Sequence, residues 1–173
     1  FVPVDKIPEQ VKNAFIAAED KNFYTHGGID YVGIVRALLG NIKNIGSGRR
    51  PAGASTITQQ VAKNMLLSSE LSYTRKIKEA ILATRIENAF SKDHILELYL
   101  NEIYLGNRSY GVAAAALNYF GKSLNELNIE EIAYLAALPK GPNNYHPKRK
   151  YEAAVGRRNW VLDLSLIHIS EPT

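Results

Sequence analysis

A chain of 173 residues with 46% hydrophobic and 22% charged residues is long enough to bury a core and has the composition of one folded domain. It has no cysteine, which excludes disulfides and thiolate metal sites, and its four histidines lack the spacing of a zinc site. The net charge is +4, but residues 36–85 hold nine Lys or Arg against two Glu, a balance of +7 that leaves −3 elsewhere.

The first predicted helix covers residues 8–20. Pro8 suits a first helical position, and apolar residues then recur at helical spacing: Val11, Ala14, Phe15 and Ala18. The helix ends on Glu19 and Asp20, followed by aromatics, a histidine and two glycines. A solvated helix end is the plain interpretation, but negative charge is mildly unfavourable at a helix C-terminus and therefore hints at function.

The remaining segments predict further helices and no run of alternating strands. Residues 31–44 are amphipathic, and the Gly/Pro/Arg-rich residues 46–53 form the expected mobile loop, with weak order over about 42–52. Further helices are expected over 55–66, 74–90, 91–106, 111–121 and 128–138. In the helix over 74–90 we expect one apolar side, formed by Ile77, Ala80 and Ile81. The predicted caps are Ser91 and Asn128, with Gly121 and Pro139 as stops.

A polar ridge follows the loop in "GASTITQQVAKN". Gln59 and Lys63 are four residues apart, as are Gln60 and Asn64, so each pair shares one helix face. The free amides of the helix start would favour an anion. The sequence is not a P-loop, and Ser55 has no histidine base nearby to make it a nucleophile. A well-capped solvent-exposed helix is the alternative.

The segment "TRKIKE" places Glu79 among cations, because Arg75 lies four residues and Lys76 three residues before it. A weak surface ion pair is the plain interpretation. Two carboxylates flanked by hydroxyls, amides and cations also suit glycosyl transfer, in which one carboxylate deprotonates an incoming hydroxyl. A hydrolase needs an acid for its leaving group, whereas a diphosphate leaving group needs cations.

Five segments in order resemble the motifs of glycosyltransferase family 51: "EDKNFYTHGGID", "GASTITQQVAKN", "RKIKEAILATRIE", "LELYLNEIYLG…YGVAAAALNYFGK" and "LAALPKGPNNYHP". This family comprises the peptidoglycan polymerases, found in class A penicillin-binding proteins and as monofunctional enzymes. The resemblance covers about residues 4–163. It implies a mainly α fold, a lysozyme-like helical lobe with a smaller membrane-associated lobe that includes about residues 32–52. We expect the domain to span 1–163, with 164–173 a tail foreign to the family.

The resemblance also implies roles for residues. Glu19 would be the general base that activates the 4-hydroxyl of lipid II, and Glu79 the second functional carboxylate. Asp20, Phe23 and His26 would hold the loop after Glu19. The substrate would also be lined by Arg36, Ser55, Thr56, Gln59, Gln60, Lys63, Asn64, Arg75 and Lys78. The reaction would polymerise lipid II into β-1,4-linked glycan with inversion and release undecaprenyl diphosphate.

The partners implied are lipid II, the growing lipid-linked strand, a membrane surface and phosphoglycolipid inhibitors such as moenomycin, with no nucleic acid. No tightly bound cofactor is expected, and no metal ligand is assigned, although Mg²⁺ or Mn²⁺ could accompany the diphosphate. Activity is expected at the outer, periplasmic face of the bacterial cytoplasmic membrane. No apolar run reaches the roughly 20 residues of a membrane span, and the chain opens on Phe1 without a signal peptide, so we expect a segment whose anchor lies elsewhere.

Two other classes of function compete. A lysozyme-like hydrolase or lytic transglycosylase would share the fold but has no use for a cluster of phosphate-binding cations. A non-catalytic basic module could bind a membrane surface or nucleic acid through the same charge. Nucleic acid is disfavoured because no recognised binding motif accompanies the basic residues.

Overall fold

The computed structural model describes residues 1–43, 54–66, 73–145, 147 and 150–170. Across these ranges it forms helices joined by short connections, with an isolated antiparallel bridge between Tyr104 and Tyr110 and no strand. The α-helices are α1 (Glu9–Glu19), α2 (Tyr31–Lys43), α3 (Ile57–Met65), α4 (Tyr73–Ala89), α5 (Lys92–Glu102), α6 (Val112–Phe120), α7 (Ile129–Ala137) and α8 (Tyr151–Ser170). Short 3-10 helices cover Val4–Lys6, Leu124–Glu126 and Pro142–Asn144. The mainly α, lysozyme-like fold class is confirmed.

Local sequence signals set the helix ends. Asn128 caps α7 by accepting from the Glu131 amide, while the Glu131 side chain accepts from the Asn128 amide. Ser91 caps α5 in the predicted way. Gly121 ends α6 at φ 67°, a left-handed conformation that glycine adopts without strain. These helices therefore begin and end at the capping residues that the sequence predicts.

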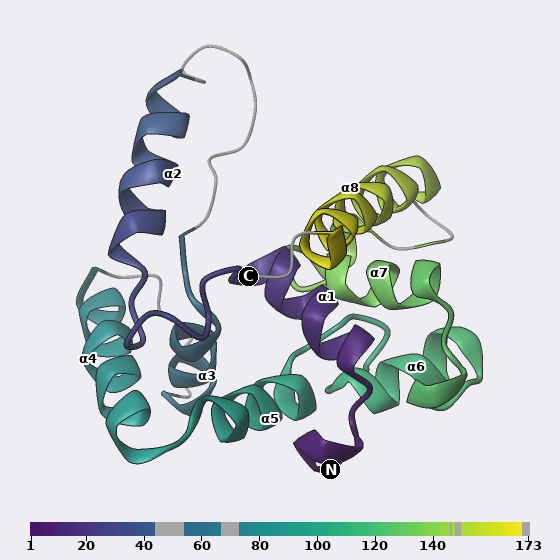
Figure 1. Cartoon of the computed structure of the whole chain (residues 1–173), viewed down its shortest axis with the longest axis horizontal. Helices are drawn as coiled ribbons and strands as arrows, with labels where there is room; N and C mark the ends of the chain where they lie inside the picture. Colours follow the sequence, from purple (N-terminus) through teal and green to yellow (C-terminus); the bar gives the residue numbers. More distant parts are fainter. Residues whose placement is uncertain (44–53, 67–72, 146, 148–149, 171–173) are drawn as a thin grey trace.

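The core lies where α1 crosses the other helices. α1 packs against α7 and α8, and α3 packs against α4 and α5. Figure 1 shows α1 and α5 between two groups of helices, α3 and α4 on one side and α6, α7 and α8 on the other. The largest buried side chains include Phe15 of α1, Tyr99 of α5 and Leu135 of α7. This packing fixes the C-terminal end of α1, where Glu19 lies.

Helix α2 differs from the rest because it projects away from the core (Figure 1) and is absent from the closely packed helix pairs. Its large apolar side chains are mostly exposed, between 56% and 71%: Tyr31, Val32, Val35, Leu38, Leu39 and Ile42. Burial of such side chains is worth about 1.5–3 kcal/mol each. An exposed set of this size indicates a surface that something else covers.

One sequence-based expectation is wrong, and another holds on a face that the structure leaves exposed. The helix expected to reach Gly106 ends at Glu102, because the chain turns into the bridged loop of Tyr104 and Tyr110. The expected apolar side of α4 is exposed, 62% at Ile77 and 52% at Ile81, while Glu79, Ala83 and Ile86 form the buried face. The face of α4 that packs on the protein is thus a different face from its apolar stripe, and it includes Glu79.

Two other expectations concern chain segments rather than single residues. Most of the expected mobile segment, including Arg49 and Arg50, lies outside the described residues. Helix α8 continues to Ser170, past residue 163 where we place the end of the domain. Among the described helices, none is both long and apolar enough to cross a membrane.

Candidate active site

The turn after α1 is built around the buried carboxylate of Asp20. It accepts hydrogen bonds from His26 Nε2 (2.9 Å) and from the Ile57 amide at the start of α3 (2.9 Å). The Gly28 amide donates to His26 Nδ1 (3.2 Å), so a neutral His26 carries its proton on Nε2 and donates it to Asp20. The Thr56 hydroxyl donates to the Gly28 carbonyl (2.7 Å). These bonds tie the ends of α1 and α3 together.

Phe23 and His26 hold this turn in place through their contacts with Lys92. Phe23 is fully buried, with the Lys92 ammonium 4.5 Å from its ring centroid. Lys92 also donates to the His26 carbonyl (2.7 Å) and to Glu87 (2.7 Å). The structure thus places Asp20, Phe23 and His26 in the framework of the turn, next to Glu19.

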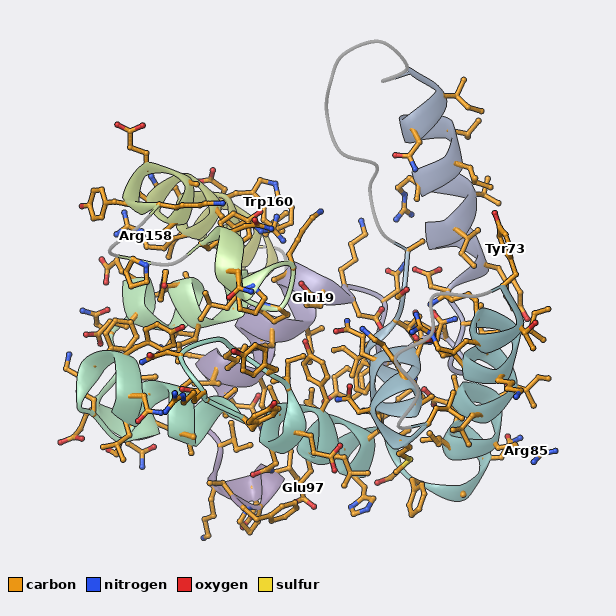
Figure 2. The ribbon with its side chains drawn as sticks, turned by 180° about the vertical axis from the view of Figure 1, so that it is seen from behind. Glu19, Tyr73, Arg85, Glu97, Arg158 and Trp160 are labelled. Carbon is orange, nitrogen blue, oxygen red and sulfur yellow. The ribbon has the colours of Figure 1, made fainter. Side chains whose placement is uncertain are left out.

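Glu19 is the last residue of α1 and reaches into a hollow between the helices (Figure 2). Gln60 Nε2 of α3 donates to its Oε2 (3.1 Å). Burial raises the pKa of Glu19, while the Gln60 hydrogen bond and the charges of Arg157 and Lys140 oppose the rise. A carboxyl whose pKa lies above its usual range is a better proton acceptor when ionised.

Glu79 has a different environment. It is 1% exposed, and its carboxylate accepts from Lys76 Nζ (2.7 Å) and pairs with Arg75 Nε (3.1 Å). Lys76 also donates to the Ser55 hydroxyl (3.0 Å), which joins α4 to the start of α3. Both ion pairs expected from the spacing are present. The Glu79 carboxylate is therefore occupied by two cations rather than open to a leaving-group oxygen.

Glu19 and Glu79 line one hollow of about 770 Å³, which we call the cationic cleft. Its lining combines both carboxylates with five cations, amides and aromatic side chains: Ala18, Glu19, Ser55, Gln59, Gln60, Lys63, Arg75, Lys76, Glu79, Lys140, Asn144, Tyr145, Arg157 and Trp160. Positive charge therefore exceeds negative charge in this lining. Such a cleft favours a substrate bearing phosphate groups.

The structure separates other expected site residues from this cleft. Arg36 of α2 lines a second hollow of about 370 Å³, which shares Glu19, Ser55 and Trp160 with the cationic cleft. Asn64 lines a third hollow beside Tyr104 and Tyr110. Lys78 is on the exposed face of α4. Thr56 is buried and caps α3 together with Gln59.

Sequence reasoning missed the contribution that the C-terminal part of the chain makes to the cleft. Lys140, Asn144 and Tyr145 come from the segment after α7, and Arg157 and Trp160 come from α8. The signal that could have indicated α8 is the spacing of Arg157 and Trp160, three residues apart and so on one helix face. The guanidinium carbon of Arg157 lies 3.7 Å from the ring centroid of Trp160.

A match to a family model decides the family: the transglycosylase model covers residues 1–165. The chain belongs to the transglycosylase family, glycosyltransferase family 51. The resemblance of the five motifs is thus confirmed, and so is the enzyme class of peptidoglycan glycosyltransferase that the family implies.

Relatives agree with this family. Penicillin-binding protein 1A of Rickettsia bellii is 56% identical over 162 residues, 94% of this chain and 20% of that protein. Penicillin-binding protein 1A of Aquifex aeolicus is also 56% identical over 94% of this chain, and 22% of its own length is covered. The crystal structure of Penicillin-Binding Protein 1A from Haemophilus influenzae matches at a TM-score of 0.53 and 29% identity, over 99% of this chain and 16% of that one. The chain thus spans about a fifth of the length of these relatives.

The donor set in the cleft does not fit a metal held by the protein. Glu79 already has Lys76 and Arg75 at its carboxylate. Within the described part of the chain, no group of three His, Cys, Asp or Glu side chains could hold an ion.

Proposed function

We propose that this domain polymerises lipid II, with Glu19 as the general base of an inverting glycosyl transfer. The observation that carries the proposal is the position of Glu19, a partly buried carboxylate of raised pKa, at the edge of a cleft lined by an excess of cations. Neither a solvated helix end nor a plain basic surface requires that combination.

Side chains of the cleft can accept both the proton and the negative charge that the glycosyl transfer releases. One oxygen of Glu19 accepts from Gln60, so the other can take the proton of the acceptor 4-hydroxyl. That hydroxyl oxygen attacks the anomeric carbon of the donor as the bond to the diphosphate oxygen breaks. The electron pair leaves on the diphosphate, and the cations of the cleft stabilise its charge. Attack opposite to the leaving group converts the α linkage into a β-1,4 linkage.

The cationic cleft supports a diphosphate leaving group over the hydrolytic alternative. A hydrolase needs a protonated acid at its leaving oxygen. Glu79, the other carboxylate of the cleft, is instead paired with two cations. A phosphoglycolipid such as moenomycin would bind through the same cations. Any Mg²⁺ or Mn²⁺ would then arrive on the diphosphate oxygens rather than on protein ligands.

We further propose that the smaller lobe rests on a membrane surface, as a lipid-linked substrate requires. The exposed apolar side chains of α2 support this, together with Tyr73, Ile77 and Ile81 of α4, which are 94%, 62% and 52% exposed. Tyr73 lies on the same side of the molecule as α2 (Figure 2). Arg36, exposed on α2, adds a charge that suits anionic headgroups. The working position would be the outer face of the bacterial cytoplasmic membrane.

The test is direct. The domain is incubated with labelled lipid II in detergent or vesicles, and the product is digested with lysozyme. We expect a polymer that lysozyme cleaves. Release of monomer-sized fragments from preformed glycan, without polymer, would favour the hydrolase instead.

A further inference from the structure

Arg157 stands out among the five cations of the cationic cleft. Lys63, Lys76 and Lys140 are exposed, and Arg75 is paired with Glu79. Arg157 is partly buried, and burial lowers the pKa of its guanidinium while the charge of Glu19 opposes that change. A charge in a partly buried position is screened less by water and salt than a charge at the surface.

The side chain of Arg157 is held in place by an aromatic ring rather than by an acid. Its guanidinium carbon lies 3.7 Å from the ring centroid of Trp160. Among the described side chains, none forms an ion pair with Arg157, and its buried Nε finds no hydrogen-bond acceptor there. Stacking on an indole favours a cation and leaves its charge available. A buried donor without an acceptor costs free energy and calls for an explanation outside packing.

The charge that Arg157 keeps available acts on Glu19. Both residues line the same cleft, and α1 packs against α8. We propose that Arg157, held against the indole of Trp160, is a positioning residue that supplies the counter-charge of Glu19 and keeps this carboxylate ionised. Because the pair is not in contact, the charge acts across the cleft and no oxygen of Glu19 is taken up by the guanidinium. The second oxygen stays open to the acceptor hydroxyl.

Other groups also face Glu19 and must be counted. The titratable and charged groups around it are Asp20, Lys21, Asp30, Arg36, Lys63, Arg75, Lys76, Glu79, Tyr99, Lys140, Tyr145 and Arg157. Asp20 raises the pKa of Glu19, and burial raises it most; Arg157 and Lys140 oppose both. Since Lys140 is exposed, Arg157 is the cation whose loss should matter more.

The inference rests on the proposed role of Glu19 as base, so its test measures Glu19 without catalysis. The 173-residue chain is labelled with ¹³C at its glutamate carboxyls, and Glu19 is assigned from the signal missing in Glu19→Gln. We expect Arg157→Gln to move the midpoint of the Glu19 titration upward by roughly one pH unit. Arg157→Lys should restore most of the shift.

Arg158→Gln is the matched control. This neighbouring arginine donates to Asn159 Oδ1 (2.7 Å) and lines another hollow, beside Tyr119 and Tyr151. Its loss should leave the Glu19 titration unchanged. Trp160→Leu, which frees the guanidinium, should shift the midpoint upward by less than Arg157→Gln and serves if that variant fails to fold.

Catalysis provides the second measurement. In Arg157→Gln the acid limb of kcat/KM for lipid II should move to higher pH with the NMR midpoint. The part of the rate loss that is due to protonation of Glu19 should return at alkaline pH, whereas any part due to the lost phosphate contact should not. An unshifted Glu19 titration, or a rate loss equal at every pH, would overturn the inference. If Glu19→Gln keeps its activity, the proposed base is wrong, yet the NMR titration still decides whether Arg157 sets the charge of Glu19.

Discussion

The two carboxylates of the cleft have opposite surroundings. Glu79 is fully buried in contact with two cations, whereas Glu19 is partly buried with one amide donor, and its cations are not in contact. A carboxylate in direct contact with cations forms ion pairs that stabilise the fold. A carboxylate whose cations lie farther away remains able to take up and release a proton. Two glutamates in one cleft can thus have different roles, set by distance to positive charge.

The largest expected effect is the loss of the base. Glu19→Gln keeps the shape and the contact with Gln60 but cannot take a proton. Polymerisation of lipid II should fall by roughly 10²–10⁴-fold, since that is the usual contribution of a general base. Initial rates with labelled lipid II measure it, with circular dichroism as the control for folding. Activity within a few-fold of the unmodified chain would remove Glu19 from the mechanism.

The next largest effect concerns Lys63, which lines the cationic cleft and, among the described residues, forms no ion pair with either of its carboxylates. Lys63→Ala should weaken the binding of a diphosphate-containing lipid by about 10–150-fold, because a charged hydrogen bond is worth roughly 1.5–3 kcal/mol. Isothermal titration with a non-reactive lipid diphosphate measures the affinity. Lys78→Ala is the matched control, since Lys78 lies on the exposed face of α4. An equal loss of affinity in both variants would mean that the cationic cleft is not the site that binds the diphosphate.

Glu79→Gln tests the structural side of the comparison. The neutral amide removes the ion pairs that Arg75 and Lys76 form with Glu79, and Arg75 is only 14% exposed. We expect the free energy of unfolding to fall by roughly 1–3 kcal/mol, measured by urea denaturation. Glu19→Gln should not destabilise the fold. The comparison fails if Glu19→Gln is the more destabilising of the two.

A smaller effect is expected at the membrane-facing helix. Leu38→Gln combined with Leu39→Gln should lower binding to anionic vesicles by roughly tenfold or more, because two exposed apolar side chains are removed from the α2 surface. Vesicle co-sedimentation measures it. Leu117→Gln is the control, since Leu117 is 65% exposed but lies on α6. An equal fall in vesicle binding in the control would mean that α2 is not the membrane-binding surface.

The smallest effect concerns stability against pH. Burial raises the pKa of Glu19 in the folded state, so the folded chain holds this proton more tightly than the unfolded chain. The contribution of Glu19 to stability should therefore decrease as pH rises from the ordinary glutamate range through the raised pKa. Thermal unfolding of the unmodified chain and of Glu19→Gln across pH 4–8 isolates this term. A difference between the two that grows in the other direction would mean that Glu19 is stabilised as a carboxylate.

Features that depend on residues close together in the sequence could be predicted. Caps at Ser91 and Asn128 and the ion pairs of Glu79 follow from residues three or four apart, and the structure has them all. Apolar periodicity also located α1 and α7. In α4 it gave the helix and its apolar side but not the exposure of Ile77 and Ile81, because periodicity alone does not distinguish a core from an exposed apolar surface.

What could not be predicted depends on contacts distant in sequence. Asp20 accepts from the Ile57 amide, 37 residues away, and Arg157 lines the same cleft as Glu19 only because α8 packs back on α1. No spacing rule covers such pairs. The family resemblance pointed to Glu19 and Lys63, but it did not distinguish Asn64 and Lys78, which lie outside the cationic cleft, from Gln60, which lies inside it.

The apolar side of α2 has a practical consequence for anyone who purifies the chain. In plain buffer, two copies can shield these side chains only by pressing them together, so apparent mass should rise with concentration. Detergent micelles would compete for the same side chains and restore single copies. A dimer seen by size-exclusion chromatography without detergent would then form because no lipid covers the apolar side chains of α2. The double variant Leu38→Gln with Leu39→Gln should abolish this dimer.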